Sequence, residues 1–231
     1  MSLATGVAFG LLLALMPLAS ANAVVGPFTL VQTIQTSTLS PASPDPAGLA
    51  YMPGPDRLMV ADSEVDEMSI FQGVNLYQVT RTGSLADTGV TTAFSNEPTG
   101  LGFNPANDTL FVSDDQKDRI FLIRPGADGR HGTSDDTRTF ISTSAFGASD
   151  PEGCEFDTGS GHLFITDGAD REVYEVSPGA NGTFDGVPPN GDDVVTHFDV
   201  GALGIVDPEG IGVDTARDTL VVSDRGSRDV F

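Results

Sequence analysis

The chain has 231 residues, which is enough for one mid-sized domain or two small ones. It carries 33 acidic and 11 basic side chains, a formal net charge of −22, so charge repulsion excludes nucleic acid and anionic membrane surfaces as partners. Its 27 glycines and 15 prolines, with abundant Val, Thr and Phe, favour many short strands joined by turns. The surplus of carboxylates fits either divalent cation binding or simple solubility in a salty or extracellular setting.

The N-terminal segment has an apolar run that is too short for a comfortable membrane span and ends in Ala21-Asn22-Ala23, an A-x-A cleavage pattern. We therefore expect a secretory signal over residues 1–23, a single mature domain over residues 24–231, and a secreted or periplasmic location. No later segment is apolar and long enough to cross a membrane. Cys154 is the only cysteine, so an internal disulfide is impossible, and its place in an alternating strand predicts a core residue.

Four copies of one pattern fill most of the remaining chain. Each copy reads as an acidic residue, Pro, a variable residue and Gly, followed by a short strand, a polar turn and a second strand such as "TLFVSD". A third strand such as "EVYEV" and a fourth such as "VTHFDV" complete the unit. Four strands recurring every 52 to 57 residues predict an all-β fold, a β-propeller of four-stranded blades. The blade heads begin at Asp45, Glu97, Asp150 and Asp207.

The fourth copy reaches only its third strand at Phe231, while the segment from Phe28 resembles a fourth strand that precedes the first blade. Two alternatives follow. The N-terminal strand completes the last blade and closes a small ring without exposed edges. Otherwise the chain is truncated from a larger ring.

Two long loops between third and fourth strands, residues 125–140 and 178–198, share Pro-Gly-Ala-Asp/Asn-Gly followed by Asp-Asp. Oxygen-rich loops with glycines suit Ca²⁺, because glycine lets backbone carbonyls turn inward. The same residues also suit a hairpin loop held by Asx turns, so structural calcium and a plain loop both remain open. The candidate ligands are Asp128, Asp135 and Asp136 in the first loop, and Asn181, Asp185, Asp192 and Asp193 in the second.

The segment "EPTGLGFNPANDTLFVSDDQKDRIFLI" resembles an NHL-type repeat, and the four copies are similar to the gluconolactonase-like and paraoxonase-like calcium-dependent propellers. Phytase-like and SdiA-regulated propellers are also similar in carrying "EG" at a blade head. In the gluconolactonase-like families the residue before the blade-head glycine faces the central channel and helps to hold a catalytic Ca²⁺. Carried over by this resemblance, the positions are Ala47, Thr99, Glu152 and Glu209.

Glu152 and Glu209 can bind Ca²⁺ through carboxylate oxygens. The acidic residues two places earlier in the four copies are candidate direct or outer ligands: Asp45, Glu97, Asp150 and Asp207. We expect a secreted Ca²⁺-dependent hydrolase acting on a small-molecule lactone or ester, for example an acyl-homoserine lactone. The metal would polarise the carbonyl, and water would be activated by one of four carboxylates: Glu152, Glu209, Asp150 or Asp207. G-x-S-x-G, H-E-x-x-H and P-loop motifs are absent, which disfavours serine hydrolases, zincins and nucleotide enzymes.

Two other readings remain open. The first is a non-catalytic, calcium-stabilised propeller that binds a protein or carbohydrate partner. The second is a phytase-like phosphoesterase, for which few basic side chains are present to grip phosphate.

Overall fold

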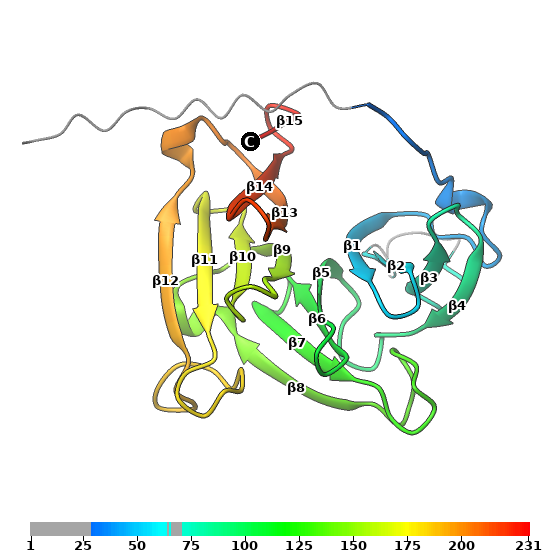
Figure 1. Ribbon diagram of the computed structural model, residues 1–231, viewed down its shortest axis with the longest axis horizontal. Helices are drawn as coiled ribbons and strands as arrows, with labels where there is room; N and C mark the ends of the chain where they lie inside the picture. Colours follow the sequence, from blue (N-terminus) through cyan, green and yellow to red (C-terminus); the bar gives the residue numbers. More distant parts are fainter. Residues whose placement is uncertain (1–28, 64, 66–70) are drawn as a thin grey trace, which may run out of the picture.

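The computed structural model describes residues 29–63, 65 and 71–231, so the expected signal segment 1–23 and Phe28 lie outside it. The fold is an all-β propeller of four antiparallel sheets, three with four strands and one with three, as the repeats predict. Figure 1 shows the sheets fanned around a common centre, with the first strand of each blade innermost. Within the described residues, no helix is long and apolar enough to cross a membrane.

The strands follow one another outward within each sheet, so every blade is a simple meander. Blade one contains β1 (Pro46–Met52), β2 (Arg57–Asp62), β3 (Leu76–Thr80) and β4 (Leu85–Gly89), and blade two contains β5 (Pro98–Asn104), β6 (Thr109–Asp114), β7 (Arg119–Arg124) and β8 (Thr137–Ser142). Blade three contains β9 (Pro151–Phe156), β10 (Leu163–Asp167), β11 (Glu172–Ser177) and β12 (Val194–Asp199), and blade four contains β13 (Pro208–Asp214), β14 (Thr219–Asp224) and β15 (Asp229–Val230). Three short 3-10 helices, η1 (Thr36–Thr38), η2 (Thr143–Phe146) and η3 (Gly201–Leu203), lie outside the sheets.

Each blade head forms a bulge in the innermost strand. In blade three, Pro151 pairs with Asp167 and Cys154 pairs with Ile165, so Glu152 and Gly153 together oppose one residue of β10. The other three blades shift register at the same place. A bulge re-aims the side chain of its extra residue. The variable residue of the acidic-Pro-x-Gly head is therefore turned toward the centre by local backbone geometry.

A buried aspartate at the end of the second strand fixes the blade head in three blades. These carboxylates are at most 2 % exposed and accept the backbone N–H of the acidic residue that starts the head. The bonds give each buried carboxylate a hydrogen-bond donor and pin the turn into the innermost strand. The pairs are Asp62 with Asp45, Asp167 with Asp150, and Asp224 with Asp207.

The core consists of apolar layers between successive blades. One cluster joins blades one and two, a second joins blades two and three, and a third joins blades three and four. Cys154 lies in the second layer at 2 % exposure, and burial raises the pKa of its thiol to about 12, as expected for a core residue. The most deeply buried side chains of these layers include Leu101, Leu110 and Leu163.

The closing strand expected as one alternative is not formed by residues 29–35. No strand lies there, and β15 has no further partner among the described residues. Ile34 and Leu39 instead pack against Val60 and Val79 on the outer face of blade one. Ile34 and Leu39 thus cover part of the first blade, whereas Leu30 and Val31 are exposed. The alternative of a larger ring stays a prediction.

Blade four has an open outer face in the part of the chain that the structure describes. A Cβ on Gly153 would collide with the backbone carbonyl of Glu209, because the next blade passes directly beside it. Gly210 occupies the same place in blade four, yet a Cβ there would meet only Ser223 of its own blade. A Cβ on Gly212 would meet nothing within 4 Å.

Candidate metal centre in the central cavity

The innermost strands of all four blades line one central cavity of about 800 Å³. The four bulge positions lie on its wall: Ala47, Thr99, Glu152 and Glu209. The resemblance placed these positions on a central channel. Two of them carry carboxylates, on blades three and four, and the other two carry a methyl group and a hydroxyl. The acidic chemistry of the cavity is therefore concentrated on one side.

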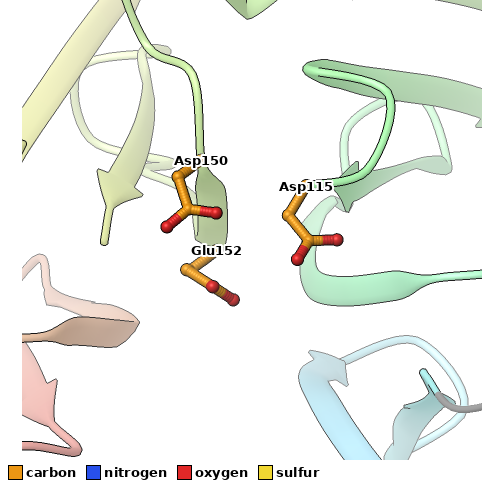
Figure 2. A group of neighbouring side chains, drawn as sticks. All are labelled: Asp115, Asp150 and Glu152. Carbon is orange, nitrogen blue, oxygen red and sulfur yellow. The ribbon is translucent and has the colours of Figure 1, made fainter. Parts of the chain in front are cut away.

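Three carboxylates converge on that side from two neighbouring blades. Asp115, Asp150 and Glu152 each offer an oxygen within 4.8 Å of the others, and all three side chains are partly buried. Figure 2 shows Asp115, which directly follows β6, facing Asp150 and Glu152 at the start of β9. Oxygen ligands at this separation suit a hard divalent cation such as Ca²⁺, which takes about six to eight oxygens.

The electrostatics of the cluster favour either a proton or a cation. Burial raises the pKa of Glu152 to about 8, and the charges of Glu209, Asp115, Asp150 and Asp207 add to the effect. The pKa values of Asp115 and Asp150 are also raised, again chiefly by burial. Each ionised carboxylate disfavours ionisation of the others. A bound cation would remove this repulsion.

Glu209 lies on the cavity wall but makes a different contact from Glu152. Its carboxylate is 3.2 Å from a guanidinium nitrogen of Arg225, and Asp207 lies 3.7 Å from the same nitrogen. Glu209 still contributes charge to the surroundings of Glu152. The close group of three thus contains Glu152 and Asp150, which the sequence indicated, together with Asp115, while Glu209 lies on the same cavity wall outside this group.

Asp115 was not among the residues singled out from the sequence. It directly follows the buried aspartate that ends the second strand of blade two. The same place holds Ser63 in blade one, Gly168 in blade three and Arg225 in blade four. Three of these four residues, all but Gly168, line the cavity. Comparison of the four repeats at this position was the signal that could have identified it.

Thr99, the bulge residue of blade two, carries no charge for a cation and instead contacts the backbone of blade three. Its hydroxyl lies 3.3 Å from the carbonyl oxygen of Glu152. The hydroxyl of Ser113 donates to the same carbonyl. Blade two therefore positions the backbone of Glu152, so the site depends on the packing of blade two against blade three.

The two outer loops bring together the acids that the sequence indicated. Asp128, Asp135 and Asp136 form one group, and Asp185, Asp192 and Asp193 form another, each with oxygens within 4.8 Å. Asn181 lies beside the second group and donates to Asp185 over 2.8 Å. The loops are thus candidate cation sites separate from the central cavity.

No family model and no curated protein matches the sequence. Among solved structures, the chain is similar to a catalytically inactive virginiamycin B lyase from Staphylococcus aureus with quinupristin (15% identity, TM-score 0.50, 82% of this chain and 52% of that one). It is also similar to a chain of a nidogen/laminin complex (20% identity, TM-score 0.51, 78% and 56%) and to a luciferin-regenerating enzyme (12% identity, TM-score 0.53, 77% and 53%).

These neighbours are NHL-repeat and gluconolactonase-like β-propellers, and the resemblance predicted from the blade heads is confirmed for the fold. The chain spans about half the length of the solved propellers that it matches. The neighbours include two enzymes and a component of a protein complex, so the fold is compatible with catalysis and with binding.

Proposed function

We propose that the chain is a Ca²⁺-dependent hydrolase whose metal is held by Asp115, Asp150 and Glu152. The convergence of these three carboxylates from adjacent blades carries the proposal. The three carboxylates carry like charges that repel one another, and their hard oxygen atoms suit Ca²⁺. They therefore fit a bound cation better than an empty cavity. Ca²⁺ bound there would polarise a substrate carbonyl and stabilise the oxyanion that develops on it.

Outside the group of Asp115, Asp150 and Glu152, Glu209 is a better candidate than Asp207 to accept a proton from the attacking water. It lines the cavity, and Arg225 holds its carboxylate in place. A general base must lie within hydrogen-bond reach of the proton that it removes, which makes a fixed side chain on the cavity wall suitable. Asp207 contacts Arg225 at a longer distance and in this scheme supports its position.

The charge of the cavity selects the substrate class. Arg225 is the one basic side chain among the described residues that line it, and it is already paired with Glu209. A phosphoester would meet an acidic wall without a free cationic group, so the phytase-like reading is the weaker one. A small uncharged lactone or ester, for example an acyl-homoserine lactone, fits this environment. We further propose export to a secreted or periplasmic location, on the cleavage pattern ending at Ala23.

The second candidate is a calcium-stabilised binding propeller without catalysis. Ala47 and Thr99 favour it, because half of the bulge positions offer no charged ligand or base. The partner would then be a protein or carbohydrate that contacts one face of the propeller. A hydrolysis assay distinguishes the two candidates.

The test compares chelated and Ca²⁺-reloaded protein on a panel of lactones, carboxylic esters and phosphoesters. The variants are Glu152→Gln and Asp115→Asn, with Asp170→Asn as a control that removes an exposed charge from blade three. We expect lactone or ester hydrolysis to depend on Ca²⁺ and to fall at least a hundredfold in both cavity variants, with the control unchanged. Absence of hydrolysis in the Ca²⁺-loaded, folded wild type would exclude the enzyme and leave the binding propeller.

A further inference from the structure

The two outer loops share a sequence pattern but use their carboxylates differently. In residues 125–136, both oxygens of Asp135 and both oxygens of Asp136 lie within hydrogen-bond distance of a donor. Asp136 Oδ2 accepts the backbone N–H groups of Gly132 and Thr133 at 2.7 and 3.1 Å. The Thr133 hydroxyl lies 2.7 Å from Asp135 Oδ1 and 3.2 Å from Asp136 Oδ1. The one hydroxyl hydrogen is shared between the two carboxylates, so the backbone and one threonine of this loop place a donor near each of these oxygens.

Residues 178–193 leave two carboxylate oxygens without a donor. Asp192 Oδ2 accepts the backbone N–H of Ala180 at 2.9 Å, and Asp193 Oδ2 accepts that of Gly186 at 2.7 Å. The Oδ1 atoms of Asp192 and Asp193 are buried and have no hydrogen-bond partner among the described residues. Asp193 as a whole is 3 % exposed. An unpaired buried carboxylate oxygen is costly, so it points to a missing ligand.

The sequence explains the difference between the loops. Gly132 and Gly186 play the same part, because each donates to the second aspartate of the Asp-Asp pair. The next residue is Thr133 in one loop and Val187 in the other. The hydroxyl that reaches Asp135 and Asp136 therefore has no counterpart beside Asp192 and Asp193.

A third carboxylate completes the group. Asp185 places an oxygen within 4.8 Å of ligand oxygens of Asp192 and Asp193. Its Oδ1 accepts the backbone N–H of Asp192 at 3.1 Å, which holds it against the Asp-Asp pair. Gly191 lies so close that a Cβ there would collide with Asp185 Oδ1.

We propose that residues 178–193 bind one Ca²⁺ through Asp185, Asp192 and Asp193, and that residues 125–136 do not bind one. The unpaired Oδ1 atoms of Asp192 and Asp193 are ligand atoms in this site, and loop carbonyls and water complete the six to eight oxygens that Ca²⁺ takes. The site is independent of the central cavity and of the proposed hydrolysis.

The site has a structural consequence at the interface of blades two and three. Phe184, next to Asp185, packs its ring 5.4 Å from that of Phe111 in β6 and 6.3 Å from that of Phe156 in β9. A cation that orders the loop also fixes Phe184 against this interface. Ca²⁺ at this site thus stabilises the same pair of blades that positions the carboxylates of the cavity.

The test measures Ca²⁺ binding by isothermal titration calorimetry on chelated protein with the cavity substitutions Asp115→Asn and Glu152→Gln. We expect this background to bind one Ca²⁺ per chain. Adding Asp193→Asn weakens that binding at least a hundredfold. The matched substitution Asp136→Asn, at the corresponding position of the other loop, leaves it within threefold.

Three results would overturn the proposal: no Ca²⁺ binding in the background, unchanged binding with Asp193→Asn, or a loss with Asp136→Asn instead. Circular dichroism checks folding. If Asp193→Asn does not fold, the exposed Asp185→Asn decides the question by the same criteria. Loss of the cavity site does not affect the result, because every variant already lacks it.

Discussion

Glu152 gives the sharpest quantitative prediction. Burial and four neighbouring acids raise its pKa from 4.5 to about 8, so the folded protein keeps this proton at pH values where the unfolded chain has lost it. The free energy of unfolding therefore falls as the pH rises from about 4.5 to about 8, and the penalty is complete above that range. The full difference corresponds to about 5 kcal/mol. Because water in the cavity screens the carboxylate, we expect about 2 kcal/mol.

Glu152→Gln removes this penalty. In a chelator at pH 9 we expect the variant to be more stable than the wild type by about 2 kcal/mol, which is about 4–8 °C in melting temperature for a chain of this size. At pH 4 the two proteins should melt together, because the wild-type carboxyl is then protonated. Excess Ca²⁺ should reverse the order at pH 9, since cation binding stabilises only the wild type.

Thermal unfolding followed by circular dichroism at the two pH values measures these differences. Asp170→Asn is the control for removing one negative charge from blade three, and we expect it to shift the melting temperature by less than about 2 °C at either pH. Equal or lower stability of Glu152→Gln at pH 9 in the chelator would refute the electrostatic account of the cavity.

Three further predictions concern the scaffold, all measured by chemical denaturation. Gly153→Ala should destabilise the protein by about 3 kcal/mol, because its Cβ collides with the backbone of the next blade. The control Gly212→Ala should change the stability by less than about 1 kcal/mol. Equal effects of the two substitutions would contradict the packing at the blade heads. Asp167→Asn should cost about 2 kcal/mol, since the buried carboxylate accepts the N–H groups of Ser149 and Asp170 at 2.8 and 2.9 Å; a neutral effect would show that its charge is dispensable. Leu163→Ala should cost about 2–5 kcal/mol, because Leu163 is fully buried in the layer between blades two and three, and a cost below about 1 kcal/mol would place it outside the core.

The repeat pattern was sufficient to predict the blades because the signals are local. Alternating apolar residues, polar turns and the acidic-Pro-x-Gly head each act within one blade, and the strands form where the pattern places them. The bulge that aims Glu152 at the cavity is also a property of the head itself. Features that arise inside a single blade were therefore accessible from sequence.

Features that depend on two blades were not. Asp115 meets Asp150 and Glu152 only because blade three packs beside blade two at a particular angle. Within blade four, the ion pair of Glu209 with Arg225 was not predicted either, because it depends on the rotamers of two long side chains. The packing of Ile34 on blade one was missed because a short apolar run suits a covering segment as well as an edge strand.

Because the core is layered, the stability of each blade depends mainly on the blades directly beside it. Each apolar layer joins consecutive blades, so the free energy of folding is close to a sum of blade terms and nearest-neighbour interface terms. In such a stack a blade with an open face opens before blades that are covered on both faces, and among the described residues blade four has such a face. Hydrogen exchange should thus be fastest in β13–β15 and slowest where blades two and three meet. The carboxylates of the cavity and the loop carrying Phe184 both lie at that junction, in the part of the stack that opens last.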